Sequence, residues 1–302
     1  FACAQISCMQ GRYEEALYEV DRSLLRNWHN AKARALKAAI LRRMGRDDEA
    51  IAFCNESLGF DKFNYGCLYV EYLIDGDKTL LDQLVALMRG CAHNYDEVAL
   101  DFCAAGLFDE AESLWRIAVE NGATTAMTYY YLGWALMQAG KKDAAEKEFA
   151  AGAAANPDFV FPNRPEAILA LQCTLGVNPV DANANHFLGN LYYDKRQYDL
   201  AQMYWERAAE LNPANPTTWR NLALLYYNKR NDAAKALECM EKAFSLDESD
   251  SRILMELDQF YKKLQKPHGE RLAFLQKYPE LIARRDDLVL EEITLLNQTG
   301  NY

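Results

Sequence analysis

Apolar residues in 182–215 recur at helical spacing and form two stripes, one before and one after a polar turn. The first stripe contains Phe187, Leu188 and Tyr192, and the second contains Ala201, Trp205 and Ala208. Gly189 and Ala208 are small where two helices would cross closely, and Trp205 is large enough to fill the space beside them. The segment therefore predicts a hairpin of two helices.

The next segment, 216–250, repeats this order, with one extra residue in the turn near Asn231. Its matching positions are Trp219, Leu222, Ala223, Tyr226, Ala236, Met240 and Ala243. Asn215 followed by Pro216 is typical of a helix start, where a side-chain cap precedes a proline at the first helical position. Because one hairpin cannot bury its stripe alone, the repetition indicates units that stack on each other.

The same phase divides most of the chain into units of about 34 residues. The complete units are 31–64, 92–125, 126–159, 182–215, 216–250 and 251–285, the partial ones are 1–30 and 286–302, 65–91 is shortened, and 160–181 is a half unit. In the half unit, Pro162 and Pro165 exclude a regular first helix, so we expect an extended segment and a seam in the stack. Asp258 stands where Gly or Ala is expected, which predicts a looser repeat in 251–285.

This residue order at this period resembles the tetratricopeptide repeat family. The resemblance implies an all-α, right-handed superhelical solenoid, with 1–302 as one stack of about 18 helices. It also implies a groove, lined by the first helix of each unit, that takes a peptide segment of a partner protein. The expected groove residues are Tyr130, Trp134, His186, Asn190, Tyr193, Arg220, Asn221, Tyr227, Arg252, Lys262 and Lys263.

One subfamily of these repeats clamps the C-terminal carboxylate of its partner with Lys and Asn side chains. Asn190, Asn221 and Arg252 resemble three of the five clamp residues. His186 and Glu256, however, stand where Lys and Arg are needed. The departure at these two positions argues against the chaperone-tail ligands of that subfamily.

The charges expected in the groove oppose the net charge of the chain, which is −11. The lining positions carry more basic than acidic residues: Lys32, Arg42, Arg43, Arg220, Arg252, Lys262 and Lys263 against Asp96, Asp194 and Asp287. A positive groove in an acidic body would steer acidic peptides towards it. The alternative is that these Lys and Arg side chains only solubilise exposed helices.

Composition and charge argue against several other classes of protein. Half of the residues are apolar and a quarter are charged, as in a soluble globular protein. The acidic net charge argues against nucleic-acid binding, and we interpret the basic run from Lys32 to Arg46 as a solvated helix face. No apolar stretch is long enough to predict a membrane span. The eight scattered cysteines do not form a disulfide framework, which favours a reducing, cytoplasmic location.

No catalytic, cofactor-binding or metal-binding pattern stands out. The four histidines lie far apart, and no phosphate-binding glycine loop or nucleophile motif is present. Cys91 and His93 with Glu97 could form a thiol–imidazole pair, but a turn cysteine and a helix-start histidine are the simpler interpretation. We therefore predict an interaction scaffold that is not an enzyme and uses no cofactor or metal.

The ends of the sequence suggest a piece of a longer polypeptide. Gly300 to Tyr302 would be a turn without its following helix, leaving Val289, Leu290, Ile293 and Leu296 exposed for self-association. A looser resemblance, through the helix after FPNRPEA, is to bacterial proteins whose repeats follow a β-rich, mutarotase-like domain of unknown function. It implies an alternative role as the accessory half of a carbohydrate-active enzyme, which the sequence upstream of Phe1 would decide.

Overall fold

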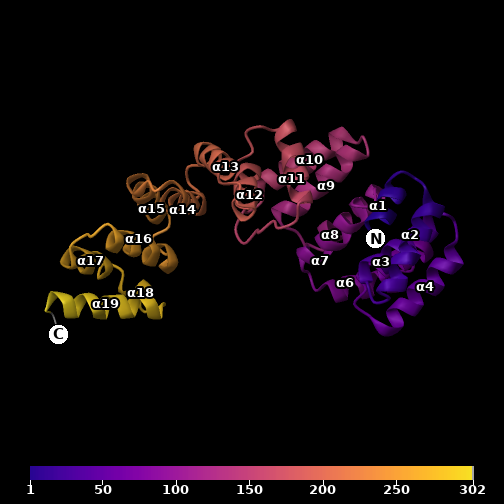
Figure 1. The fold of residues 1–302 in the computed structure, drawn as a ribbon, viewed down its shortest axis with the longest axis horizontal. Helices are drawn as coiled ribbons and strands as arrows, with labels where there is room; N and C mark the ends of the chain where they lie inside the picture. The colour runs from indigo at the N-terminus through magenta and orange to yellow at the C-terminus, as the bar shows by residue number, and fades with distance from the viewer. Residues whose placement is uncertain (301–302) are drawn as a thin grey trace. The chain divides into compact units, whose positions relative to one another are not determined.

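Helices account for all regular secondary structure in the computed structural model, which describes residues 1–300 (Figure 1). The expected all-α fold of stacked helical hairpins is confirmed, with 19 α-helices and one π-helical turn in the described range. The residues Asn301 and Tyr302 of the predicted last turn lie outside it. Within that range, no helix is both long enough and apolar enough to cross a membrane.

The chain divides into two compact units. Unit 1 comprises Phe1–Val160 with Arg164–Val177, and unit 2 comprises Phe161–Asn163 with Asn178–Tyr302. The division falls in the stretch that its prolines predicted to be extended, and no helix lies between the end of α10 at Ala154 and the start of α11 at Glu166. The predicted absence of a regular first helix from the half repeat 160–181 is therefore confirmed.

The helices of unit 1 are α1 (Ala2–Met9), α2 (Tyr13–Arg26), α3 (Ala31–Arg43), α4 (Asp47–Phe60), α5 (Tyr65–Asp75), α6 (Lys78–Met88), α7 (Ala92–Cys103), α8 (Phe108–Glu120), α9 (Ala126–Gln138), α10 (Lys142–Ala154) and α11 (Glu166–Val177). Odd-numbered helices up to α9 are the first helices of their hairpins. The half repeat 160–181 supplies only α11, which packs against α9.

The helices of unit 2 are α12 (Ala182–Asp194), α13 (Tyr198–Leu211), α14 (Pro216–Leu225), the π-helical turn η1 (Tyr226–Arg230), α15 (Ala233–Leu246), α16 (Ser251–Lys263), α17 (His268–Leu275), α18 (Pro279–Ile282) and α19 (Asp286–Thr299). Here α12, α14 and α16 are first helices. The extra residue predicted near Asn231 is accommodated by η1, where a wider turn absorbs the insertion.

A glycine in the first helix brings an aromatic ring of the second helix into close contact in both units. A Cβ atom added to Gly133 would lie 2.4 Å from the ring of Phe149, and one added to Gly189 would lie 2.2 Å from Trp205. Phe149 and Trp205 are both buried. The prediction that Gly189 stands at a close helix crossing filled by Trp205 is confirmed.

The repeat that contains Asp258 has a buried ion pair at the position predicted to be loose. Asp258 is fully buried, and its carboxylate accepts hydrogen bonds of 3.0 and 2.6 Å from Arg271. Arg271 also donates to Glu291 of α19 at 2.6 Å. The carboxylate connects α16 to α17 and, through Arg271, to α19. The second helix of this repeat is nevertheless divided into the short helices α17 and α18, as a looser repeat predicts.

Unit 1 contains contacts between different repeats, including repeats that are not neighbours along the chain. A Cβ atom added to Gly106, which has a positive φ, would lie 2.8 Å from the Cα atom of Met9, so the turn after α7 packs closely on α1. The Tyr69 hydroxyl of α5 donates a 2.7 Å hydrogen bond to the backbone carbonyl of Glu110 in α8. In Figure 1, α1, α3, α7 and α8 accordingly lie near one another. The later helices of unit 1 therefore pack against helices that come earlier in the same unit.

Candidate functional site

Five of the predicted groove residues in unit 2 belong to one connected set of polar contacts, which we call the unit 2 ladder. It consists of Thr218, His186, Asn190, Asn221, Arg220, Glu256 and Arg252. Its side chains come from α12, α14 and α16, the three successive first helices. These positions lie one repeat apart in the sequence, so the hydrogen bonds run from the first helix of each repeat to the first helix of the next.

The inner end of the ladder is buried and uncharged. His186 Nδ1 lies 2.8 Å from the Thr218 hydroxyl, and its Nε2 lies 3.1 Å from the Asn190 amide nitrogen. Burial lowers the pKa of His186 to about 4, because the imidazolium would lose its hydration. His186 is therefore neutral near pH 7, and it supports Asn190 rather than meeting a ligand as a cation.

Asn190 joins two neighbouring hairpins. Its side-chain oxygen accepts a 3.0 Å hydrogen bond from the Trp205 indole and one of 3.1 Å from the Asn221 amide. Trp205 is the ring that packs on Gly189, so the same contact fixes the helix crossing and the amide. Both asparagines are half-buried, which leaves part of each amide accessible.

The outer end of the ladder carries two cations and one carboxylate. Arg220 and Glu256 form a two-bonded pair, with a Nε–Oε2 distance of 2.6 Å. Arg252 reaches the same carboxylate at 3.3 Å, and its side chain is 61% exposed. Of the two guanidinium groups, only that of Arg252 is open to solvent.

Neighbouring rings hold the two predicted aromatic residues of unit 2 in place. The Tyr193 ring packs against Tyr198 and Trp205, with ring centroids 5.4 and 5.3 Å apart. The Tyr227 ring packs against Phe260 at 5.0 Å, and the Lys263 ammonium lies 4.6 Å from its centroid. Both tyrosines are half-buried, so each exposes part of a ring that its neighbours hold in place. We call Asn190, Tyr193, Asn221, Tyr227 and Arg252 the first-helix face of unit 2.

The remaining predicted groove residues lie elsewhere. Tyr130 in α9 of unit 1 is 0% exposed, and Gly152 of α10 packs against its ring. Trp134 is also buried and makes an edge contact with Phe108. Lys262 pairs with both carboxylate oxygens of Glu291 at 2.9 Å. Tyr130 and Trp134 thus pack inside unit 1, where the sequence phase suggested lining positions.

The cations predicted to line the groove in unit 1 are all paired. Lys32 binds Asp101 at 2.9 Å, and both Arg42 and Arg43 donate to Glu110, which is only 3% exposed. Asp96, predicted as a lining acid, is buried, and it accepts a 2.9 Å hydrogen bond from the Trp115 indole. The predicted excess of basic over acidic lining residues left out five carboxylates that pair with them. When all predicted positions of both units are counted together, this excess is cancelled by Glu97, Asp101, Glu110, Glu256 and Glu291.

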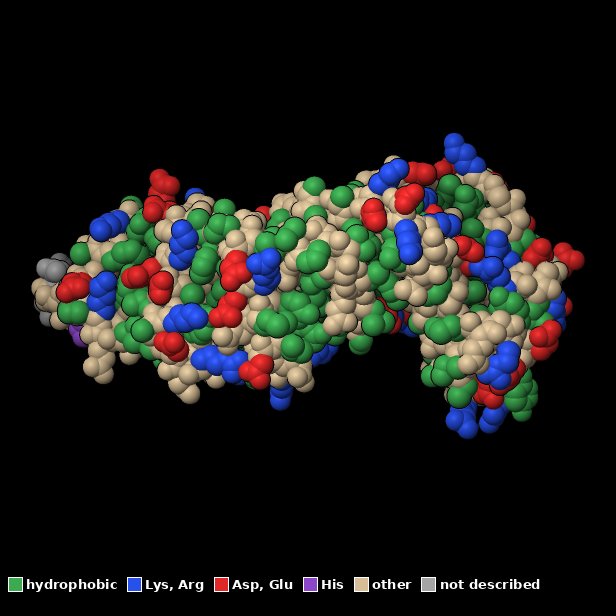
Figure 2. All heavy atoms as spheres, turned by 90° about the horizontal axis from the view of Figure 1, so that it is seen from above, with side chains coloured by type: hydrophobic (Ala, Val, Ile, Leu, Met, Phe, Trp, Pro, Cys, Tyr) green, Lys and Arg blue, Asp and Glu red, His purple; other side chains and the backbone are tan. Residues whose placement is uncertain are grey.

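The basic run from Lys32 to Arg46 forms no positive patch. Arg34 is fully buried, and its guanidinium lies over the rings of Trp28, Phe53 and Phe60 at 4.3–4.7 Å. Lys37 pairs with Asp21 at 2.7 Å, and Arg46 pairs with Glu49. On the face drawn in Figure 2, basic and acidic side chains likewise alternate. The structure gives nucleic acid no concentrated positive surface on these residues.

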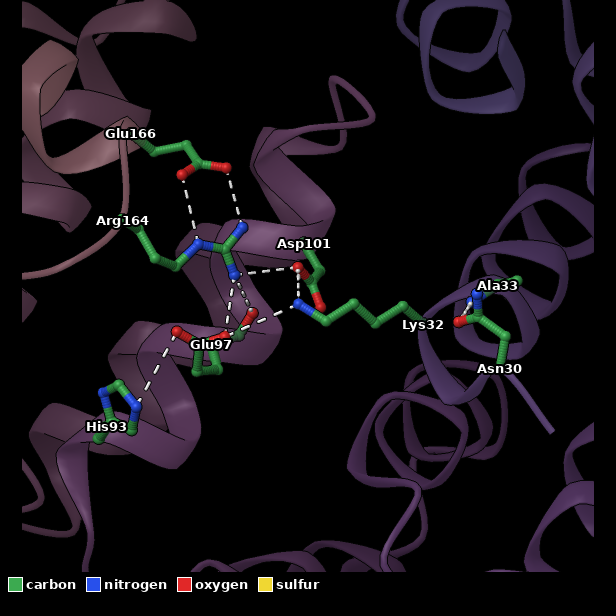
Figure 3. A network of polar contacts seen from close by, with 8 residues as sticks. All are labelled: Asn30, Lys32, Ala33, His93, Glu97, Asp101, Arg164 and Glu166. Atoms are coloured by element: carbon green, nitrogen blue, oxygen red, sulfur yellow. Dashed lines mark hydrogen bonds and ion pairs between the residues drawn. The ribbon is translucent and has the colours of Figure 1, made fainter. Parts of the chain in front are cut away.

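A second polar network lies in unit 1, around a residue that the sequence interpretation did not single out (Figure 3). Arg164 donates to Glu166 at 2.8 and 3.3 Å, and one of its terminal nitrogens lies 3.0 Å from both Glu97 and Asp101. Lys32 joins the same two carboxylates from α3, at 3.7 and 2.9 Å. The network therefore connects α3, α7 and the segment before α11.

The pKa shifts of Arg164 and Glu166 favour the ionised forms of this pair. Burial raises the pKa of Glu166, but hydrogen bonds and the charge of Arg164 outweigh burial and lower the pKa below its usual value. Burial alone would lower the pKa of Arg164, and its carboxylate partners raise it instead. The signal for Arg164 in the sequence was its place between Pro162 and Pro165, which keep the segment extended.

The histidine of the thiol–imidazole pair considered in the sequence has a charged contact. His93 Nε2 lies 3.9 Å from Glu97, an exposed contact at the edge of the Arg164 network. In residues 1–300, no cluster of three or more His, Cys, Asp or Glu side chains is arranged to hold a metal ion. All eight cysteines are free thiols, and five of them are buried.

Comparison with known proteins gives one family match and several matches to solved structures. The family model described as Tetratricopeptide repeat matches residues 9–65, 99–158 and 187–251, more than half of the chain. The Cut9–Hcn1 hetero-tetramer of APC/C is 16% identical, with 94% of this chain and 52% of that chain covered and a TM-score of 0.38.

Two further solved structures are similar. YrrB, described as a TPR protein with an unusual peptide-binding site, is 16% identical over 78% of this chain and 95% of that chain, with a TM-score of 0.30. MamA (residues 41–end) from Desulfovibrio magneticus RS-1 is 19% identical over 65% and 97%, with a TM-score of 0.37. At these TM-scores the structural likenesses carry no argument, and the comparison rests on the residues matched by the family model.

Proposed function

The chain belongs to the tetratricopeptide repeat family, and from this premise we propose that it is a non-catalytic scaffold that binds a peptide segment of a partner protein on the first-helix face of unit 2. The observation that carries the proposal is the unit 2 ladder. It holds Asn190 and Asn221 in place while Arg252 and the rings of Tyr193 and Tyr227 stay accessible. Such rigid aromatic and Arg side chains are typical of interface hot spots.

The charge of this face supports an acidic peptide or a C-terminal carboxylate as the ligand. Arg220 and Arg252 share one carboxylate, that of Glu256, so one positive charge is left over. Lys263 adds an exposed ammonium beside Tyr227. A ligand carboxylate at Arg252 would gain a charge-assisted hydrogen bond without breaking the Arg220–Glu256 pair. The excess positive charge of the proposed site therefore resides in Arg252 and Lys263.

Fluorescence anisotropy with labelled peptides of equal length, one acidic, one basic and one neutral, tests this proposal. We expect the acidic peptide to bind best, and Arg252→Glu to weaken it about ten-fold or more by removing one charge-assisted hydrogen bond and adding repulsion. Lys242→Glu on α15, an exposed position away from the ladder, makes the same charge change and serves as the control. Preference for the basic peptide, or equal loss in both variants, would refute the proposal.

Two finer expectations remain proposals. Leu290 and Ile293 of α19 are exposed and Val289 and Leu296 are partly buried, which supports self-association through this helix. The alternative role, as the repeat half of a carbohydrate-active enzyme, depends on sequence outside residues 1–302. No contact in the described range favours it over the scaffold.

A further inference from the structure

Unit 1 contains a small apolar cavity that neither the sequence pattern nor the proposed function of unit 2 uses. Its volume is about 190 Å³, and it lies between α3, the start of α5 and α7. Ala35, Leu36, Val98 and Phe102 form part of its apolar lining. Because Ala35 is small, α3 and α7 leave space between them. A cavity of about 150 Å³ with such a lining is large enough to bind benzene.

The mouth of the cavity is polar and belongs to the Arg164 network. Lys32, Glu97 and Asp101 line it together with the half-exposed ring of Phe63. Arg164 is only 17% exposed, and its contacts with Glu97 and Asp101 hold the two carboxylates side by side. The cavity therefore joins an apolar interior to a pair of carboxylates in fixed positions.

The charges of the network favour a cationic partner. Glu97, Asp101 and Glu166 supply three carboxylates against the two cations Lys32 and Arg164, so one negative charge is left over. Lys32 is 50% exposed, and a flexible chain carries its ammonium. A cation from a partner can take its place at Asp101 while Arg164 stays with Glu166.

We propose that this cavity is a second peptide-docking site, which takes one aromatic side chain of a partner segment whose neighbouring residue is Lys or Arg. The ring would fill the space beside Val98, and the neighbouring cation would bind Glu97 and Asp101 in place of Lys32. The charge preference is opposite to that of the first-helix face of unit 2. The proposal does not depend on that face, because every residue it uses lies in unit 1.

The test uses a labelled peptide with Lys-Phe-Lys at its centre, and two matched peptides in which Ala replaces Phe or Glu replaces both Lys. Anisotropy should show binding of the first peptide. Each replacement should weaken it about ten-fold or more, because burial of one aromatic ring accounts for an effect of this size and a like charge opposes binding. Equal binding of the Glu-Phe-Glu peptide would overturn the proposal.

Variants locate the site. Val98→Phe fills the cavity and should abolish binding, and Glu97→Gln should weaken it about ten-fold without altering the apolar lining. Glu146→Gln on α10 removes the same charge from an exposed position and should bind as the parent does. If circular dichroism shows that Val98→Phe has lost its fold, Glu97→Gln decides. Unchanged binding by Glu97→Gln would refute the site.

Competition separates this proposal from the one for unit 2. An excess of the unlabelled acidic peptide should leave the Lys-Phe-Lys peptide bound, because the two ligands use different residues. Displacement by the acidic peptide would show a shared site and contradict the proposed cavity. If the acidic peptide does not bind at all, the function proposed for unit 2 fails, while the result for the Lys-Phe-Lys peptide still decides the cavity.

Discussion

The two units are made of the same kind of hairpin, yet they treat the charges on their first helices differently. In unit 1, Lys32, Arg42 and Arg43 of α3 pair with carboxylates 67–69 residues away, on α7 and α8. In unit 2, Arg220 pairs with Glu256, 36 residues along the chain and on the next first helix. In unit 1, these three cations of α3 are thus paired with carboxylates of other helices of the same unit. In unit 2, the Arg252 side chain stays exposed to solvent, although it reaches Glu256.

This difference follows a difference in repeat length between the two units. The shortened repeat 65–91 precedes α7, and the chain then returns to α1 and α3. In unit 1 the cavity beside Val98 is the opening proposed as a docking site. Unit 2 has repeats of nearly regular length, so its ladder runs along the stack and one side of it stays accessible.

The largest expected effect comes from breaking the contact that closes unit 1. Glu110→Gln keeps the shape of a nearly buried side chain but leaves Arg42 and Arg43 without their carboxylate. We expect a loss of about 3 kcal/mol in the free energy of unfolding of unit 1. Glu256→Gln, the counterpart in the more exposed pair of unit 2, should cost about 1 kcal/mol.

Amide hydrogen exchange, read helix by helix, separates the two units in this experiment. Protection should fall in α3, α7 and α8 for Glu110→Gln, and in α14 and α16 for Glu256→Gln. Equal losses for the two variants would show that the cross-repeat contacts of unit 1 do not differ in strength from the neighbour contacts of unit 2.

The second prediction is that Asp96 of unit 1 and His186 of unit 2 contribute to stability with opposite pH dependence. Burial raises the pKa of Asp96 to about 7, even though the Trp115 hydrogen bond lowers it. A raised carboxyl pKa stabilises the fold below the unfolded value of 3.8, and this stability is lost as pH rises through 7. His186 has its pKa lowered to about 4, so its stability is present above 6.5 and is lost as pH falls.

Between pH 4 and 6.5, the contribution of Asp96 to the stability of unit 1 should therefore fall with rising pH while that of His186 to unit 2 grows, each by on the order of 2 kcal/mol. Asp96→Asn should flatten the profile of unit 1 only, and His186→Gln that of unit 2 only. Hydrogen exchange at several pH values measures both. A variant whose profile equals that of the parent would contradict the titration assigned to its residue.

The smallest effect should come from the feature that the units share. Gly133→Ala and Gly189→Ala each place a methyl group against an aromatic ring of the second helix. We expect each to destabilise its own unit by about 1 kcal/mol, since overpacking outweighs the gain in helix propensity. Chemical denaturation measures this, with Gly176→Ala as a control because no atom lies within 4 Å of the added Cβ. A large difference between the two variants would mean that hairpin packing differs as well.

Local pattern was sufficient to predict the repeated hairpins, their caps and the seam. The Gly189–Trp205 crossing, the Asn215 cap and the insertion near Asn231 each depend on residues within one repeat. Helical period, side-chain size and backbone restriction act over such distances, so the sequence alone determined them. The ladder residues Asn190, Asn221 and Arg252 could be named for the same reason, since the family places them at fixed positions in each unit.

Tertiary structure alone decided which of the named side chains are free. The sequence could not show that Glu110 would meet Arg42 and Arg43, that Tyr130 and Asp96 would be buried, or that Arg164 would bind two carboxylates of α7. These pairings span 63–68 residues and depend on how the shortened repeat redirects the stack. Charge pairing is set by distance in space, and periodicity along the chain carries no record of that distance across a break in the repeat.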